Sequence, residues 1–377
     1  MSILLERFRI CAARAHNLSL AVSIVSIFGL MAGDALSQEY KYKCEEIEQK
    51  SVLSSFGSQV YQGYDGWFFR RYELKSMFEM PDSVVSMFAN VNRALASKGT
   101  HLILLPMLPK GMAAYDFLPK DGVLADMIFD VRLAREDYRR MTSVLNDVGL
   151  DVVNLEEALR EDPSFDRNSY YFKRDLHWQP AGARFAANKV AERIESRVSD
   201  AMGNVEYTTS GPVEGRLVSS LNLVLNELCQ SPVPSEPIEL YETKQVVSSL
   251  DDLLTEEPVT DTAFLHVVGS SFTDEAKPFA FNDFLRARLR RVVDGFSIAG
   301  GGVDQSIYAW AQKSEGLGRK PRFVVWELPN LADLIKLAPE MNRTIVPAIV
   351  GSCENEYLIA SQKFESSSQI DFDFPDL

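Results

Sequence analysis

The chain has 377 residues, of which 46% are hydrophobic and 24% are charged, and its formal net charge is −14. This composition excludes an intrinsically disordered, collagen-like or small disulfide-stapled protein, and the length is sufficient for one large or two medium domains. Because 53 acidic residues outnumber 39 basic ones, the chain is poorly suited to neutralise a phosphate backbone, and we expect no nucleic-acid partner.

The first 37 residues have the layout of an export signal. A positively charged start, with Arg7, Arg9 and Arg14, precedes an apolar run over residues 18–32. The small residues after this run match a signal-peptide cleavage site. The run is shorter than the roughly 20 residues that span a bilayer. We therefore predict a secretory signal peptide, with an uncleaved anchor or a buried core helix as alternatives, and expect residues 38–377 to lie outside the cytoplasm.

The mature chain opens with a turn, a strand and one helix–strand step. Glycines punctuate a turn over 63–66, which leads into a short aromatic strand over 67–69. A helix is predicted from Pro81 to Leu95, because its apolar residues recur on one face. The continuous apolar run from His101 to Leu108 predicts a core strand.

The alternation of helices and strands recurs along the chain and favours an α/β fold, with a mostly parallel sheet between two helical layers. The pattern predicts helices at 131–148, 180–198, 284–291 and 303–313, and strands at 151–155, 263–268, 291–296 and 322–328. The signals weaken over 199–262, which includes an acidic patch at 251–257 and which we interpret as an inserted cap segment. The acidic end at 366–377 is either a docked edge or a frayed tail.

The cysteines permit one disulfide in the mature chain. Cys11 lies inside the predicted signal, so Cys44, Cys229 and Cys353 remain and can form at most one intramolecular bridge. We predict the pair Cys44–Cys229, with three free thiols as the alternative. Because no Cys-x-x-Cys spacing occurs and only three histidines follow residue 37, we expect neither a metal site nor a cofactor.

One predicted strand runs directly into serine hydroxyls. The strand over 263–268 is followed by Gly269, Ser270, Ser271 and Phe272. A glycine turn at the end of a buried strand can hold a serine Oγ above the sheet, with backbone N–H groups directed at the same space. The segment therefore predicts a nucleophilic serine, with an ordinary turn as the alternative.

A candidate base lies in the segment Asp175-Leu176-His177-Trp178. In an extended chain, residues two apart point to one face about 7 Å from each other. The Asp175 carboxylate could then hydrogen-bond the His177 imidazole and fix its tautomer, as a serine nucleophile requires. A structural role for His177 is the alternative. His266, within an apolar strand, and His101, at the start of a strand, have no neighbouring carboxylate in a suitable place along the sequence.

Five motifs, in the order of the family, resemble the alginate O-acetyltransferase AlgX/AlgJ family of SGNH-hydrolase-like proteins. They are Gly63–Phe69 followed by Glu73 and Leu74, Asp175-x-His177-Trp178, Gly269-Ser270-Ser271-Phe272, Gly300–Gly302, and Val324-Val325-Trp326-Glu327. Together they extend over nearly the whole mature chain. The resemblance implies an SGNH-hydrolase-like, flavodoxin-like three-layer sandwich over residues 38–377, with the insertion at about 199–262.

The resemblance also implies a catalytic triad. Ser271 is the acyl-accepting nucleophile, His177 the general base and acid, and Asp175 the residue that orients His177. The order Asp, His, Ser along the chain is the permuted arrangement of this family. Asp or Thr often stands where this chain has Ser270, so either hydroxyl could be the nucleophile, and we favour Ser271 because it directly precedes the aromatic residue.

By this resemblance the chain is a periplasmic O-acetyltransferase, which passes an acetyl group from a membrane-bound acyltransferase to a hydroxyl of an alginate-like exopolysaccharide. Its partners are the polysaccharide acceptor, that donor and an exopolysaccharide synthesis and export complex. The sequence ends soon after the strand with Trp326, which makes an AlgJ-like protein a closer analogy than AlgX. The alternatives are an SGNH acetylesterase that uses the same triad and a non-catalytic assembly factor.

Four residues are candidate substrate contacts under this interpretation. Trp326 could stack on a sugar ring, Gly301 at a helix start could donate an N–H to an anion, and Lys110 and Arg174 could pair with a uronate. The alternatives are a core position for Trp326, a flexible loop for Gly301 and solvated surface positions for Lys110 and Arg174.

Overall fold

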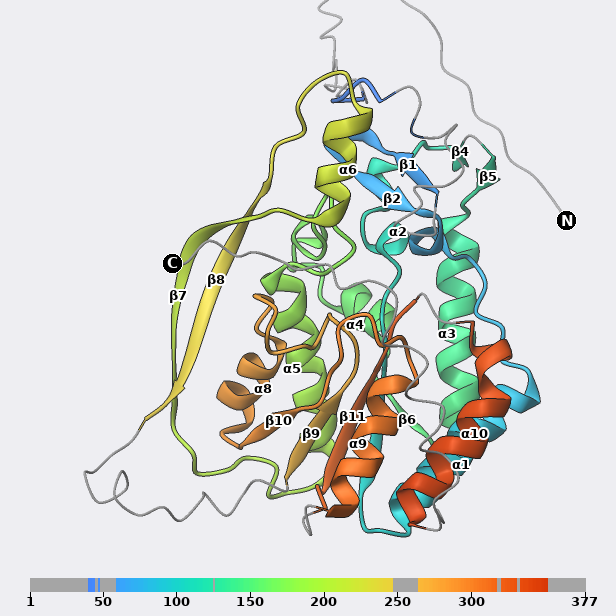
Figure 1. Cartoon of the computed structure of the whole chain (residues 1–377), viewed down its shortest axis with the longest axis vertical. Coiled ribbons are helices and arrows are strands. Elements are labelled where there is room, and N and C mark those ends of the chain that lie inside the picture. Colours follow the sequence, from blue (N-terminus) through green and yellow to red (C-terminus); the bar gives the residue numbers. More distant parts are fainter. Residues whose placement is uncertain are drawn as a thin grey trace, which may run out of the picture. The chain divides into compact units, whose positions relative to one another are not determined.

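The centre of the computed structural model is a sheet of five parallel strands (Figure 1). These are β3 (His101–Pro106), β6 (Asp151–Val152), β9 (Leu265–Val268), β10 (Val293–Gly295) and β11 (Phe323–Leu328). Their order across the sheet is β10–β9–β11–β3–β6. Every residue of β9 and β11 is buried, as expected for inner strands of a sheet that helices cover on both faces.

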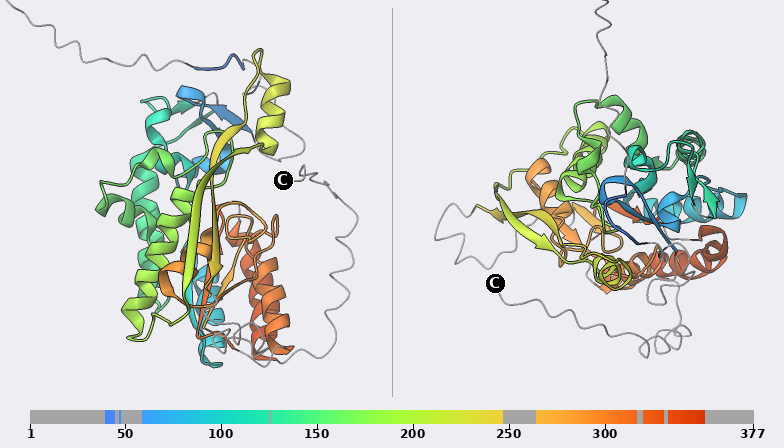
Figure 2. Two further views of the ribbon diagram at one scale, coloured as in Figure 1. Left: turned by 90° about the vertical axis from the view of Figure 1, so that its left-hand side faces the viewer. Right: turned by 90° about the horizontal axis from the view of Figure 1, so that it is seen from above.

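Helices form a layer on either side of this sheet (Figure 2). One layer consists of α1 (Asp82–Ala96), α9 (Gln305–Gly316) and α10 (Leu334–Val350), and the other of α3 (Val131–Asp147), α4 (Leu155–Glu161), α5 (Pro180–Arg197) and α8 (Phe281–Leu289). Both layers bury their apolar sides in one large hydrophobic core around the sheet. The three-layer α/β fold with a parallel sheet is therefore confirmed.

The structure describes residues 40–44, 47, 59–124, 126–246, 264–316, 320–330 and 333–351. The predicted export signal, the acidic patch at 251–257, Cys353 and the segment 366–377 lie outside these ranges. Every described residue belongs to the compact unit formed by residues 38–377. None of the helices in the described ranges is long and apolar enough to cross a membrane.

The segment predicted as an insertion contains a long antiparallel strand pair. β7 (Tyr207–Leu217) pairs with β8 (Glu236–Gln245), and α6 (Ser220–Leu228) lies between them in sequence. β7 is exposed along most of its length, but α6 packs in a second, smaller apolar cluster with Cys44 and Phe68. The predicted disulfide between Cys44 and Cys229 is present in this cluster and ties the start of the described chain to the end of α6.

Short elements complete the fold around the cluster and the sheet edge. They are β1 (Val60–Gln62), β2 (Phe68–Arg70), α2 (Lys110–Ala113), β4 (Val123–Leu124), β5 (Met127–Ile128) and the 3₁₀ turns η1 (Tyr64–Gly66), η2 (Arg71–Leu74), η3 (Tyr115–Phe117) and η4 (Arg167–Ser169). β1 and β2 form an antiparallel pair. Their connection is the glycine turn that the sequence predicts over 63–66.

Candidate active site

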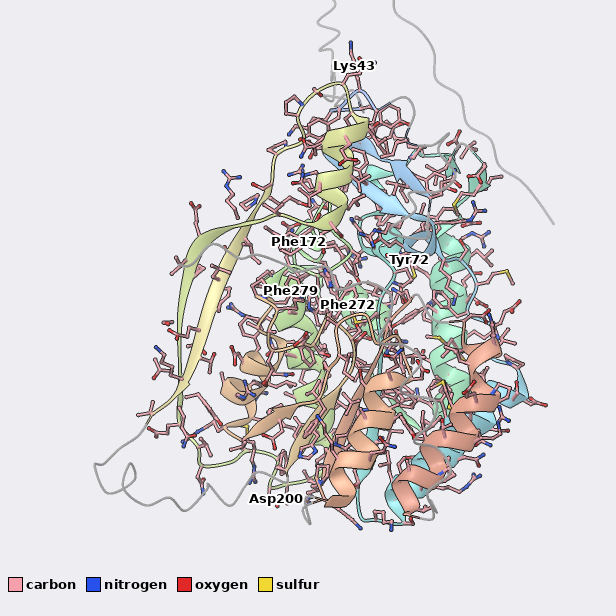
Figure 3. All side chains as sticks on the ribbon, viewed as in Figure 1. Lys43, Tyr72, Phe172, Asp200, Phe272 and Phe279 are labelled. Carbon is pink, nitrogen blue, oxygen red and sulfur yellow. A yellow bond between two sulfur atoms is a disulfide. The ribbon has the colours of Figure 1, made fainter. Side chains whose placement is uncertain are left out.

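The carboxyl ends of the parallel strands meet at one edge of the sheet, and the residues with predicted chemistry gather there. Ser271 follows β9 by three residues, and Glu327 lies one residue before the end of β11. Because β9 and β11 are neighbours that run in the same direction, the segments that follow them occupy the same edge. Figure 3 marks this region with the labelled side chains of Phe172, Phe272 and Phe279.

The turn after β9 separates the two serines that the sequence leaves open. Ser270 is buried, and its Oγ donates a hydrogen bond to Glu327 Oε2 at 2.8 Å. Ser271 is half-buried, and its Oγ lies 2.7 Å from His177 Nε2. The hydroxyl that faces the imidazole is therefore that of Ser271.

His177 lies in a short loop closed by a β-bridge between Tyr171 and Trp178. The N–H of Phe172 donates to the His177 carbonyl at 3.2 Å inside this loop. Residues 173–177 follow turns and bends, so the prediction of an extended segment is wrong. The reason is an Asx turn: the Asp175 side chain accepts the backbone N–H of His177 at 2.8 Å, which folds the chain back on itself.

This turn still brings the predicted pair together. Asp175 Oδ1 lies 2.5 Å from His177 Nδ1, and His177 Nε2 lies 2.7 Å from Ser271 Oγ. The imidazole, with a side-chain exposure of 14%, stacks on Phe279 with ring centroids 4.7 Å apart and contacts Phe272 at 4.9 Å. Two aromatic rings and one carboxylate thus fix the orientation of the base.

The environment of Asp175 keeps its carboxyl ionised. Burial alone would raise its pKa, but the charge of His177 and the hydrogen bonds from His177 lower the pKa of Asp175 to about 2. An ionised carboxylate at Nδ1 holds the proton on that nitrogen and leaves Nε2 as the acceptor for the Ser271 proton. The arrangement can perform nucleophilic acyl chemistry.

The backbone N–H of Ser271 has no acceptor among the described residues, whereas the N–H of Ser270 donates to Glu327 Oε2 at 2.6 Å. An unengaged N–H next to a nucleophilic Oγ can stabilise an oxyanion that forms at the attacked carbonyl. The turn therefore carries a nucleophile and a candidate oxyanion donor on the same residue.

Two of the four predicted substrate contacts belong to the core instead. Trp326 has 0% of its surface exposed, and its Nε1 donates to the Val303 carbonyl at 3.0 Å, so it cannot stack on a sugar. Gly301 is buried, and its N–H donates to the Ile298 carbonyl at 3.0 Å. That N–H is unavailable to an anion, and both predictions are wrong because each donor already has an internal acceptor.

The two predicted cationic contacts are also buried. Lys110 is 1% exposed, and its Nζ donates to the carbonyls of Phe68, Lys173 and Asp175 at 2.8, 3.1 and 2.8 Å. Arg174 is buried, with its Nε 3.9 Å from Glu236 Oε1. Neither cation can meet a uronate in solution, so both predictions are wrong, because backbone carbonyls and an internal carboxylate take up the charges.

The other two described histidines do have carboxylate neighbours, contrary to the prediction. His101 Nε2 lies 2.9 Å from Asp151 Oδ2, and His266 Nε2 lies 3.4 Å from Asp294 Oδ2. These partners come from adjacent strands, which the sequence spacing cannot reveal. His101 begins β3 at the amino end of the sheet, and His266 accepts a hydrogen bond from Trp310 Nε1 at 2.9 Å. Neither is at the edge that carries Ser271.

Sequence reasoning missed the residues that hold the Asp175 loop in place. The carboxylate of Glu236, the first residue of β8, accepts the N–H groups of Lys173 at 2.8 Å and Arg174 at 2.5 Å. Ser219 Oγ donates to the Arg174 carbonyl at 2.7 Å. The inserted segment therefore supports the active site, although no local pattern in the sequence points to either residue. Among the described residues, no group of three or more His, Cys, Asp or Glu side chains is placed to hold a metal ion.

Comparisons with known proteins show the family and the fold. The family model described as "SGNH hydrolase-like domain, acetyltransferase AlgX" matches residues 60–330. The alginate biosynthesis protein AlgX of Pseudomonas aeruginosa is 23% identical over 316 residues, which cover 82% of this chain and 63% of that protein. The "Probable alginate O-acetylase AlgJ" of the same species is 24% identical over 284 residues, or 71% of this chain and 68% of that protein. The chain thus spans less than two thirds of the length of the AlgX relative.

Two solved structures share the fold. The structure of Pseudomonas aeruginosa AlgX has a TM-score of 0.67 at 21% identity and covers 80% of this chain and 70% of its own. The O-acetyltransferase domain of Pseudomonas putida AlgJ has a TM-score of 0.57 at 20% identity and covers 77% of this chain and 99% of its own. The expected SGNH-hydrolase-like fold is therefore confirmed.

Proposed function

The chain belongs to the SGNH hydrolase-like AlgX acetyltransferase family, and on this premise we propose that it moves an acetyl group through Ser271 to a hydroxyl of an exopolysaccharide. The observation that carries the proposal is the hydrogen-bonded series from Asp175 through His177 to Ser271, with distances of 2.5 and 2.7 Å. A nucleophile, a base and a group that orients the base are the parts that acyl transfer through a serine ester requires.

The first half-reaction loads the serine. Ser271 Oγ attacks the carbonyl carbon of the donor's acetyl ester or thioester while its proton passes to His177 Nε2. The N–H of Ser271 stabilises the oxyanion, and the ionised Asp175 stabilises the imidazolium. The bond to the leaving group then breaks, the leaving group takes the proton from His177, and the acetyl group remains as an ester on Ser271.

The second half-reaction passes the acetyl group to the acceptor. A sugar hydroxyl gives its proton to His177 and attacks the serine ester, and collapse of the intermediate returns that proton to Ser271 Oγ. Water competes at this step, so transfer requires that the acceptor hydroxyl be positioned at the ester. The similarity to an alginate biosynthesis protein and to a probable alginate O-acetylase supports an alginate-like polysaccharide as the acceptor.

The proposal includes the cellular setting. The first 37 residues act as an export signal or anchor, and residues 38–377 work in the periplasm as one acyltransferase domain with the insertion at about 199–262. A membrane-bound acyltransferase supplies the acetyl group, within a complex that synthesises and exports the polymer. The Cys44–Cys229 disulfide supports an oxidising compartment.

The proposal is tested with the purified mature chain, p-nitrophenyl acetate as donor and an oligomannuronate as acceptor. Ser271→Ala removes the nucleophile, so release of nitrophenol and mass-spectrometric detection of acetylated sugar both fall to background. Ser196→Ala, which removes an exposed hydroxyl from α5, is the matched control and leaves both signals intact.

The other outcomes identify the alternatives. Ester cleavage that depends on Ser271 but never acetylates sugar, even with abundant acceptor, indicates an acetylesterase. Polymer acetylation that persists in cells carrying Ser271→Ala, with the protein present, indicates an assembly factor and overturns the proposed chemistry.

A further inference from the structure

A buried carboxyl group fastens the turn that carries Ser271. Glu327, in β11, is 0% exposed, and its Oε2 accepts hydrogen bonds from the N–H of Ser270 at 2.6 Å and from Ser270 Oγ at 2.8 Å. Glu327 thus engages both polar donors of the residue that precedes the nucleophile.

The register of the sheet places this carboxyl directly beside the turn. Trp326 pairs with Val268, the last residue of β9, so Glu327 is level with Gly269, where the chain leaves the sheet. A Cβ atom at Gly269 would lie 2.5 Å from Glu327 Oε2 and 2.5 Å from Thr273 Oγ1. The glycine is required here because the carboxyl group occupies the space that any side chain would need.

Other groups hold the residues on either side of Ser270. Ser306 Oγ donates to the Gly269 carbonyl at 2.5 Å, and Trp178 Nε1 donates to the Phe272 carbonyl at 3.0 Å. Both donors of Ser270 itself are directed to Glu327. Within the turn the Thr273 N–H donates to the Ser270 carbonyl at 3.1 Å, and Glu327 is the group that ties Ser270 to the neighbouring strand.

We propose that Glu327 is a positioning residue for the nucleophile: it fixes Ser270 so that Ser271 keeps its Oγ on His177 and its N–H available to the oxyanion. The inference rests on the proposed function, because it assigns Ser271 as the nucleophile. The inference predicts that Glu327 affects the rate of the reaction rather than the affinity for substrate, because its side chain is buried and does not reach the solvent.

The role requires an acceptor at this point rather than a negative charge. Burial raises the pKa of Glu327 to about 7, against the lowering effect of the hydrogen bonds from Ser270, so the neutral acid is accessible near neutral pH. Glu327 Oε1 has no hydrogen-bond partner among the described residues. A glutamine amide can therefore present its oxygen to Ser270 and reproduce the neutral carboxyl group.

The test compares Glu327→Ala and Glu327→Gln in the purified mature chain, with p-nitrophenyl acetate as the probe. Misplacement of a reacting group by about 1 Å can cost about 100-fold in rate, so we expect E327A to lower kcat by that order while KM stays near the wild-type value. E327Q keeps the acceptor and restores most of kcat, which a general loss of stability would not do.

The matched control is Asp151→Asn, because Asp151 is another buried carboxyl on a sheet strand, but at the amino end of β6, where it pairs with Arg197 and His101. D151N lowers the melting temperature and leaves kcat unchanged. If E327A does not fold, Ser270→Ala replaces it: loss of one of the two donors to Glu327 lowers kcat several-fold at unchanged KM.

The outcomes separate this inference from the proposed function. If Ser271→Ala is inactive but E327A has the wild-type kcat, the positioning role is overturned and the proposed function stands. The same conclusion follows if E327A does not fold and S270A has the wild-type kcat. Activity that survives Ser271→Ala overturns the proposed function and this inference together. A loss of kcat in E327A that E327Q fails to restore also overturns the inference, because it would mean that the acceptor is not what the turn requires.

Discussion

The Asp175 carboxylate makes two contacts with His177 through one oxygen, and they have different consequences. The contact with the backbone N–H, at 2.8 Å, shapes the loop, whereas the contact with Nδ1, at 2.5 Å, sets the tautomer of the imidazole. An asparagine could keep the first contact. An amide that turns its N–H₂ group toward Nδ1 gives up that contact, and it favours the tautomer with the proton on Nε2.

Asp175→Asn is therefore expected to lower kcat for p-nitrophenyl acetate by about four orders of magnitude, as the wrong tautomer does in serine proteases. The melting temperature should change little, because Glu236 and Ser219 still hold residues 173 and 174 of the loop. Asp147→Asn, an exposed substitution at the end of α3, is the control with wild-type kcat. A D175N enzyme with more than about a tenth of the wild-type kcat would contradict the assigned role of Asp175.

Lys110 stabilises the loop that contains Asp175 and His177 from the interior of the protein. Its Nζ donates to three carbonyls, two of them in the loop at Lys173 and Asp175, and it lies 5.5 Å from the ring centroids of Trp67 and Phe69. Burial lowers the pKa of Lys110, and the nearby carboxylate of Glu73, 3.9 Å from Nζ, opposes that shift. The buried ammonium is thus surrounded by oxygen acceptors.

Lys110→Met is expected to lower the free energy of unfolding by about 3 kcal/mol, because it leaves a buried carboxyl group and several carbonyls without their donor. Urea denaturation measures the change, and Lys120→Met, at an exposed position, is the control within about 0.5 kcal/mol of wild type. An equally stable K110M protein would mean that the cation makes no net contribution to the fold.

At the scale of elements, the active-site loop depends on a part of the chain that has no catalytic side chain. Glu236 at the start of β8 and Ser219 before α6 hold residues 173 and 174, and α6 is itself tied to Cys44 by the disulfide. The stability of the segment from β7 to β8 should therefore affect both the global fold and the geometry of the active-site loop.

Replacement of both Cys44 and Cys229 by serine is expected to lower the free energy of unfolding by about 2–4 kcal/mol, since the bridge closes a long loop in the unfolded chain. The measurement is urea denaturation of the double variant against wild type. The same shift should appear in wild type treated with a reductant, and reductant should have no effect on the variant. If neither the double substitution nor the reductant shifts the urea denaturation curve, the disulfide does not contribute to stability.

The element pattern was predictable wherever local periodicity agrees with tertiary burial. Helices α1, α3 and α5 begin and end within two residues of their predicted bounds, because their apolar faces meet the sheet. Helix α10 was missed. It contains Pro339 and Pro347, which break a helical pattern in sequence, yet its buried face packs on α1.

At the scale of the whole molecule, parallel topology brings Ser271, after β9, to the carboxyl edge of the sheet, whereas the grouping of Ser271 with His177 and Asp175 is what the family resemblance implies. The residues that support the triad were not predictable. Lys110, Glu236 and Glu327 look like ordinary surface charges in sequence, and their burial follows only from how loops and strands pack. An acidic residue near the end of an otherwise apolar strand, as at Glu327, is the one local signal that could have been followed.

The buried carboxyl groups also give the folded chain opposite responses to pH. The pKa of Asp175 is lowered to about 2, so its stabilising contribution is present above its ordinary value of 3.8 and is lost as the pH falls toward 2. The pKa of Glu327 is raised from 4.5 to about 7, so the folded chain keeps a proton that the unfolded chain has released. The contribution of Glu327 is therefore complete below pH 4.5 and is lost as the pH rises to 7.

Glu327→Gln removes this titration. We expect the stability of wild type relative to E327Q to fall by about 3 kcal/mol between pH 4.5 and 7, because each pH unit over this interval corresponds to about 1.4 kcal/mol. Urea denaturation at several pH values measures the difference, and Glu340→Gln, at an exposed position on α10, supplies the flat reference. A constant difference between wild type and E327Q across the interval would mean that Glu327 ionises normally in the folded protein. The turn would then hold a charged carboxylate at all working pH values.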